Sequence, residues 1–162
     1  MKKLILAVLV AFSTGAFAQS TMKEDVDIIQ AHYGKSKKEL VGAYMKMEGA
    51  QSEAFWKIYD QYEEERKALG REKIRIINDY AASYSSLTDV KADELGKAAM
   101  KNNMDFEKLT SKYYEKVKTA AGAMQAVKFI QLETYLQTAV RSAIQDAIPF
   151  IGELDKSKVP GQ

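Results

Sequence analysis

Proline is absent from the long middle of this chain, and this absence constrains the fold more than any other feature. The only two prolines, Pro149 and Pro160, lie near the end of the 162 residues. Proline removes a backbone hydrogen bond and clashes with the preceding turn, so it commonly ends a helix. Nothing between residues 19 and 148 forbids helix, and the apolar–polar alternation typical of strands is absent. The sequence therefore predicts an all-α fold.

Three long segments repeat apolar residues at spacings of three and four, which is the pattern of amphipathic helices. These segments cover about residues 50–85, 89–120 and 123–147, within an expected region of three long helices at residues 48–151. Gly122 separates the last two, and Pro149 ends the last one. Long helices joined by short turns are expected to lie antiparallel, as an extended helical hairpin or bundle. The same faces would also suit a homodimer, and the pattern leaves the oligomeric state open.

Two shorter helices are expected in residues 19–47. One covers about residues 23–33, and the other begins after Ser36, which forms a capping box with Glu39 three residues later. The pattern leaves open whether these short helices dock on the long ones or stay mobile. The residues expected on the apolar side of the second short helix are Leu40, Val41 and Tyr44.

Residues 1–18 have the pattern of a secretory signal peptide. Two lysines precede an apolar run from Leu4 to Phe12, and the small residues Ala16 and Ala18 form a cleavage site. The apolar run is shorter than the roughly 20 residues that a membrane-spanning helix needs. We therefore expect cleavage after Ala18, a location in the bacterial periplasm, and no transmembrane segment in the remaining chain.

Removal of this signal peptide changes the charge of the chain. The whole chain has 24 basic and 22 acidic residues, and two of the basic ones lie in the signal peptide. The remainder, expected to be a single helical domain at 19–151 and a polar tail at 152–162, is then neutral. Neutrality gives no general reason to expect binding to nucleic acid or to an anionic membrane. The chain has no cysteine, so its stability depends on packing without disulfides.

The residues that carry out catalysis or bind metals do not occur in useful combinations. One histidine, His32, without any cysteine cannot build a standard zinc site, and no glycine-rich phosphate loop is present. The acidic residues between Asp60 and Glu65 point in different directions on the expected helix. We therefore expect no catalytic, cofactor or metal site, and a protein that is not an enzyme.

Methionines and aromatic residues are the remaining candidates for function. Tyrosine and methionine suit adaptable binding surfaces, although the same residues at helical spacing also fill helix cores. Thioether pairs can also bind Cu(I), which makes metal binding an alternative. The residues expected to line a binding surface are Trp56, Tyr59, Tyr62, Met100, Met104 and Phe106.

Two expected helix starts look alike. Gln51 is followed four residues later by Phe55, and Gln125 is followed four residues later by Phe129. This arrangement resembles the periplasmic Spy/CpxP family, in which an LTxxQ motif occurs twice at helix starts. In that motif the threonine caps the helix and the glutamine at the third helical position completes a capping box.

The resemblance covers about residues 40–150, and further similarity lies in Phe55–Tyr59, Gln131–Glu133 and Ile148–Phe150. It points to a divergent, poorly characterised branch of the family. The family implies cradle-shaped helical dimers that act as ATP-independent chaperones or as regulators of envelope stress and metal response. We therefore expect a non-enzymatic periplasmic protein that binds unfolded or partner polypeptides. The alternatives are a metal-responsive sensor or scavenger and a structural partner of an envelope complex.

Overall fold

The computed structural model describes residue 29 and residues 33–148 of the chain. The expected signal peptide, His32, most of the expected helix at 23–33 and the polar tail at 152–162 lie outside these residues. Within the described residues all regular elements are helical, which confirms the all-α prediction. The elements are α2 (Lys37–Met45), α3 (Gly49–Ser83), the 3₁₀ turn η1 (Tyr84–Ser86), α4 (Asp89–Ala121) and α5 (Ala123–Ala147).

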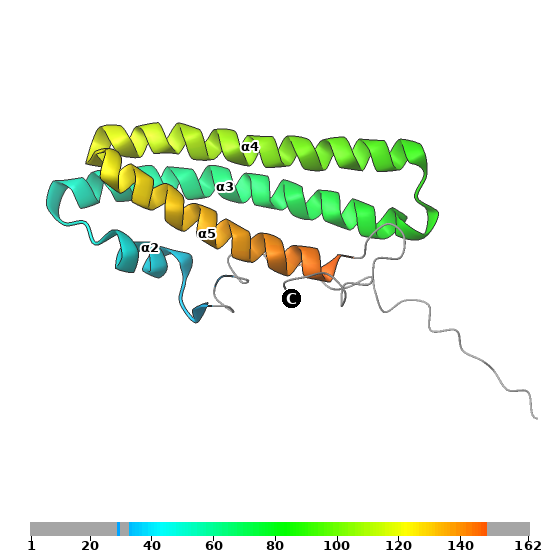
Figure 1. The fold of residues 1–162 in the computed structure, drawn as a ribbon, viewed down its shortest axis with the longest axis horizontal. Helices are drawn as coiled ribbons and strands as arrows, with labels where there is room; N and C mark the ends of the chain where they lie inside the picture. The colour runs from blue at the N-terminus through cyan, green and yellow to red at the C-terminus, as the bar shows by residue number, and fades with distance from the viewer. Residues whose placement is uncertain (1–28, 30–32, 149–162) are drawn as a thin grey trace, which may run out of the picture.

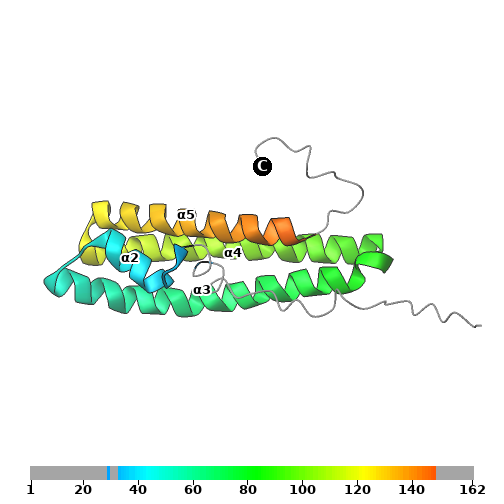
Figure 2. The same ribbon diagram turned by 90° about the horizontal axis from the view of Figure 1, so that it is seen from below.

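The three long helices form an elongated antiparallel bundle (Figure 1). The middle of the chain crosses the molecule as α3, returns as α4 beside it, and crosses again as α5, which packs against α4. The short helix α2 lies at the end where α5 begins, and the view from below places it between α3 and α5 (Figure 2). The expected antiparallel arrangement of long helices is therefore present.

Local sequence explains where the helices begin. Ser36 accepts a hydrogen bond from the Glu39 backbone N–H at 3.3 Å, and the Ser36 backbone N–H donates to the Glu39 carboxylate at 2.8 Å. This reciprocal capping box was expected from the sequence and is confirmed. Thr88 caps α4 in a similar way by accepting a hydrogen bond from the Lys91 backbone N–H at 3.3 Å.

The buried side of α2 agrees with the expected one only in part. The sequence predicted Leu40, Val41 and Tyr44 on the apolar side, but Tyr44 is 40% exposed. The helix instead buries Lys37, Val41 and Met45, which lie four residues apart on one stripe. Val41 is buried as expected and Leu40 packs against a second buried cluster, so the expectation was wrong for Tyr44 and lacked Lys37 and Met45.

The centre of the bundle is an aromatic cluster contributed by all three long helices. The Tyr62 ring of α3 lies 5.3 Å from the Tyr113 ring of α4 and 5.2 Å from the Phe129 ring of α5, measured between ring centroids. Phe55 also contacts Phe129, with centroids 6.1 Å apart. Because these rings are almost fully buried, they hold the three helices together by apolar burial and edge-on ring contacts.

We predict that Phe129→Ala lowers the free energy of unfolding by about 3–5 kcal/mol, because it leaves a cavity where α3 and α5 meet. The matched control is Met124→Ala on the same helix, since Met124 is 75% exposed. Its effect is expected to stay within about 0.5 kcal/mol. Chemical denaturation followed by circular dichroism measures both values. Equal effects of the two substitutions would contradict this assignment of the core.

Candidate functional site

The two glutamines of the sequence repeat lie at equivalent positions. Gln51 and Gln125 are the third residues of α3 and α5, as expected from the resemblance. Neither helix start has a side-chain cap, since Glu48 makes no capping hydrogen bond and Gly122 has no side chain. The Gln125 Oε1 atom is buried without a hydrogen-bond partner. The glutamines therefore mark two helix starts without completing capping boxes there.

The two phenylalanines of the repeat have a clear structural role. Phe55 and Phe129 are both buried, at 0% and 1% exposure, and their rings contact each other. The repeat thus places one aromatic anchor in the first turns of each helix, at the end of the bundle where α2 docks. These two residues are structural and are not available to a ligand in this conformation.

The six residues expected to form one binding surface divide between core and solvent. Tyr59, Tyr62 and Phe106 are buried at 2%, 1% and 8% exposure, so this part of the expected surface is core. They face the other long helices because they continue the apolar stripes of α3 and α4. Trp56 is half-buried beside α2. Met100 and Met104 are 60% and 55% exposed and remain accessible.

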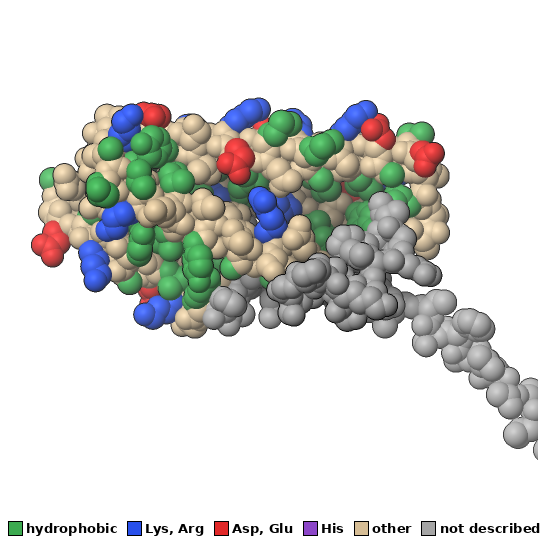
Figure 3. Space-filling view, in the orientation of Figure 1, with side chains coloured by type: hydrophobic (Ala, Val, Ile, Leu, Met, Phe, Trp, Pro, Cys, Tyr) green, Lys and Arg blue, Asp and Glu red, His purple; other side chains and the backbone are tan. Residues whose placement is uncertain are grey.

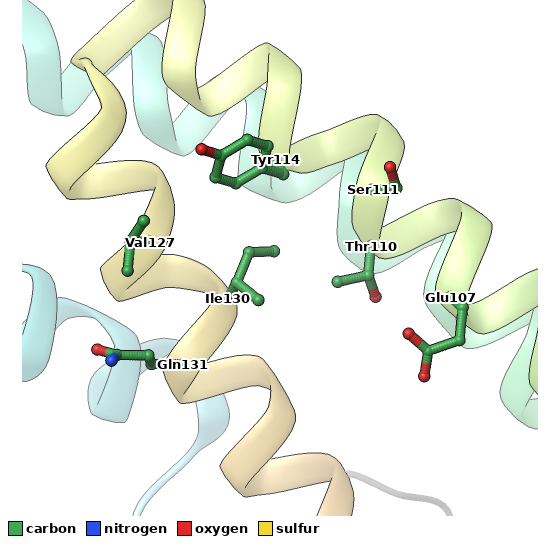
Figure 4. A pocket seen from close by; sticks show the side chains of 7 residues that line it. All are labelled: Glu107, Thr110, Ser111, Tyr114, Val127, Ile130 and Gln131. Carbon is green, nitrogen blue, oxygen red and sulfur yellow. The ribbon is translucent and has the colours of Figure 1, made fainter.

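A groove between α4 and α5 offers an accessible apolar surface (Figure 4). Its volume is about 310 Å³. Tyr114, Val127 and Ile130 point into it, and polar side chains lie along its edges. We call it the α4–α5 groove, and its lining residues are Glu107, Thr110, Ser111, Tyr114, Val127, Ile130 and Gln131.

Exposed methionines continue the α4–α5 groove at both ends. Met104 lies one helical turn from Glu107 on α4, and Met124 lies one turn from Val127 on α5. Because the two helices are antiparallel, these methionines flank opposite ends of the groove. Figure 3 shows hydrophobic side chains gathered at the end of the molecule where α4 turns into α5. The surface is therefore larger than the groove alone.

A cluster of charged and polar side chains is buried where α2, α3 and α5 meet, and we call it the Lys37 cluster. The Lys37 Nζ atom donates to Glu63 of α3 at 2.6 Å and to Glu133 of α5 at 2.7 Å. Tyr62 donates to the same Glu133 oxygen at 2.8 Å, and Arg66 Nε donates to Glu63 at 2.8 Å. Two cations balance two carboxylates, so the Lys37 cluster carries no net charge.

The Lys37 cluster shifts the pKa values of Glu63 and Tyr62. Burial alone raises the pKa of Glu63, but the charges of Lys37 and Arg66 outweigh burial and place its pKa below the ordinary 4.5. Burial, together with the negative charge of Glu133, raises the pKa of Tyr62 well above its ordinary value. The Glu133 Oε1 atom and the Tyr59 hydroxyl are buried without hydrogen-bond partners. Part of the hydrogen-bonding capacity beside Lys37 is thus unused.

The Lys37 cluster was not predicted from the sequence, although two signals point to it. Arg66 interrupts the apolar stripe of α3, and Glu133 occupies a core position of α5 between Phe129 and Leu136. A charged residue at a core position is uncommon unless it is paired. No pattern in the sequence identifies Lys37 as the partner, because it lies 96 residues from Glu133.

The part of the chain that the structure describes contains neither a metal-binding cluster nor a membrane-spanning helix. There, no three or more histidine, cysteine, aspartate or glutamate side chains come together in a way that could hold a metal ion. No helix within residues 33–148 combines the length and the apolar character needed to cross a membrane.

We predict that Glu133→Gln destabilises the fold by about 3–5 kcal/mol, because it leaves the buried Lys37 ammonium without one of its two counter-ions. Asp60→Asn is the matched control, since it removes the partner of Lys38 in an ion pair that also joins α2 to α3 but is exposed. That change is expected to cost about 0–1 kcal/mol. Urea denaturation at pH 7 measures both, and a similar cost for the two variants would contradict the burial of the Lys37 cluster.

The lowered pKa of Glu63 predicts how stability changes in acid. A carboxyl whose pKa is lower in the folded state stabilises the fold above its unfolded pKa and loses this contribution as the pH falls through the folded pKa. Stability should therefore decline below about pH 4.5, and Glu63→Gln should show a smaller decline over this range. Urea midpoints between pH 7 and pH 3 test this, with Glu115→Gln, which alters an exposed pair with Lys118, as the control. Superimposable acid profiles of Glu63→Gln and wild type would refute the prediction.

The chain was compared with protein-family models, with curated proteins and with solved structures, and none of the three comparisons finds a match. The resemblance to the Spy/CpxP family therefore remains a prediction from the sequence. Function has to be inferred from the α4–α5 groove and the Lys37 cluster themselves.

Proposed function

We propose that this protein is a non-enzymatic, ATP-independent chaperone-like protein of the periplasm, which binds apolar segments of other polypeptides through the α4–α5 groove. The observation that carries the proposal is this groove of about 310 Å³, flanked by exposed methionines on a bundle whose other large apolar side chains are mostly buried. Exposed apolar surface of this kind marks sites of interaction with other molecules.

The chemistry of the surface favours clients of varied sequence. Met104 and Met124, at 55% and 75% exposure, have flexible thioether side chains that adapt to different apolar partners. Tyr114 adds a large ring with a polar tip at the groove. Polar residues along the groove edges, such as Gln131 and Ser111, can bond to the backbone of a bound segment. The proposed location follows from the signal-peptide pattern of residues 1–18.

We predict that Val127→Glu lowers the chaperone activity several-fold, because it places a charge inside the α4–α5 groove. The measurement is light scattering of a chemically denatured client that aggregates on dilution, with the protein at stoichiometric concentration. Val90→Glu is the matched control. Val90 is 80% exposed and lies in the first turn of α4, away from the residues of α4 that line the groove. This control should suppress aggregation as well as wild type.

Two outcomes would reject the proposed function. The first is that wild-type protein fails to suppress aggregation at stoichiometric concentration and does not crosslink to the client. The second is that Val127→Glu and Val90→Glu reduce suppression equally, which would show that binding does not depend on the α4–α5 groove. Circular dichroism of both variants establishes that they remain folded.

A further inference from the structure

The helix α2 lies on the bundle in the manner of a bound peptide. Of its nine residues, three side chains are buried, and they follow one stripe at every fourth position. Lys37, Val41 and Met45 have 4%, 0% and 1% exposure, whereas Tyr44 on the outer side is 40% exposed. Such regularly spaced anchors are typical of an amphipathic helix that lies in a groove.

The floor beneath α2 is apolar at one end. Val41 and Met45 pack into the same buried cluster as Phe55 and Tyr59 of α3 and Phe129 of α5. This surface, together with the carboxylates of Glu63 and Glu133 beside Lys37, forms what we call the α3–α5 groove. The buried residues beneath α2 are not among the lining residues of the α4–α5 groove. The two grooves adjoin at Gln131, which lines the α4–α5 groove and accepts a hydrogen bond from Tyr44 of α2 at 3.4 Å.

The other end of the α3–α5 groove is built to hold an ammonium group. The Lys37 Nζ atom lies 5.8 Å and 5.3 Å from the ring centroids of Tyr59 and Tyr62, within the range of cation–π attraction. It also donates to carboxylates from two helices. Without Lys37, the two glutamates would exceed the single charge of Arg66, so this end of the groove would carry a net negative charge. It therefore selects a cationic side chain over a neutral one.

The attachment of α2 to the rest of the chain permits exchange. Only Lys46, Met47 and Glu48 connect it to α3. A nine-residue helix is too short to be stable alone, since isolated helices below about 12–15 residues are marginal. The outer contacts are exposed, such as the Lys38–Asp60 ion pair with both side chains more than half exposed. Besides its three buried side chains, α2 is held by the Met45 backbone oxygen, which accepts a hydrogen bond from Lys128 of α5 at 3.0 Å.

We infer that the α3–α5 groove is a receptor for an amphipathic helix that presents lysine, an aliphatic residue and methionine at every fourth position. In this structure α2 is the internal occupant of that receptor, and a partner helix with the same pattern displaces it. Two observations identify the partner. Its lysine complements the negative charges of Glu63 and Glu133, and its apolar residues occupy the positions that Val41 and Met45 of α2 fill here. This inference does not depend on the function proposed for the α4–α5 groove.

The test uses the full-length protein and a fluorescent, end-capped peptide with the sequence of residues 36–46. Val41→Ala in the protein weakens the hold of α2 without altering the ammonium site, and it raises the fraction of molecules whose receptor is open. The apparent affinity for the peptide should therefore rise about tenfold over wild type, because it scales with that fraction. Fluorescence anisotropy measures the binding. A peptide carrying Lys37→Met should bind Val41→Ala protein at least about tenfold more weakly, since it lacks the charge that Glu63 and Glu133 attract.

Each result supports or overturns the inference. Equal binding of the lysine and methionine peptides, or equal binding by wild-type and Val41→Ala protein, overturns it. Loss of peptide binding on adding Val127→Glu also overturns it, because the peptide would then occupy the α4–α5 groove. If circular dichroism shows that the Val41→Ala protein is unfolded, Asp60→Asn protein replaces it, because this change loosens α2 by removing only the exposed Lys38–Asp60 ion pair. The same order of peptide affinities is expected. A failed aggregation assay with successful peptide binding would reject only the chaperone proposal.

Discussion

The burial of the Lys37 ammonium between Glu63 and Glu133 is the interaction on which the arrangement of this molecule depends. The two carboxylates come from α3 and α5, and the ammonium comes from α2, so one group connects three helices. Removing two charges from water is costly, and a buried ion pair adds little net stability compared with apolar residues of the same size. Its effect is on specificity, because any shift of α2 along the groove would leave charges buried without partners. The cluster therefore sets the position of α2.

The aromatic core explains why there is space for α2. α3 and α5 meet through long side chains, such as Tyr62 and Phe129 with ring centroids 5.2 Å apart. This leaves a groove above the rings, which Val41 and Met45 fill. No helix among the described residues covers Tyr114 and Val127, and the α4–α5 groove stays open. The same three-helix bundle thus presents one occupied groove and one open groove.

Much of the backbone could be predicted from local sequence. The absence of proline before Pro149, the glycine at Gly122 and the capping box of Ser36 and Glu39 are local signals, and the helices begin and end close to where these signals place them. Local signals suffice because helix hydrogen bonds connect residues only four positions apart. The apolar stripes likewise placed Phe106 correctly on a helix. They did not show that its side chain is buried in the bundle and does not lie on a binding surface.

The candidate sites could not be predicted in the same way, because they depend on contacts between distant segments. Periodicity alone cannot distinguish an aromatic residue that packs inside, such as Tyr59, from a methionine that stays outside, such as Met100. It also gives no sign that Lys37 is buried, since its partners lie 26 and 96 residues away. In the sequence, this network is indicated only by two charged residues at core positions, Arg66 and Glu133.

The most direct test of this account is the hydrogen exchange of the lysine ammonium groups, measured by NMR on protein labelled with ¹⁵N at lysine side chains. The ammonium of Lys37 is buried and donates to two carboxylates, so its protons should exchange slowly with water at neutral pH. We expect a protected ammonium signal that disappears in Lys37→Met, while exposed lysines such as Lys97 exchange rapidly. Rapid exchange of the Lys37 ammonium, at the rate of the surface lysines, would contradict the buried cluster and the position of α2 that depends on it.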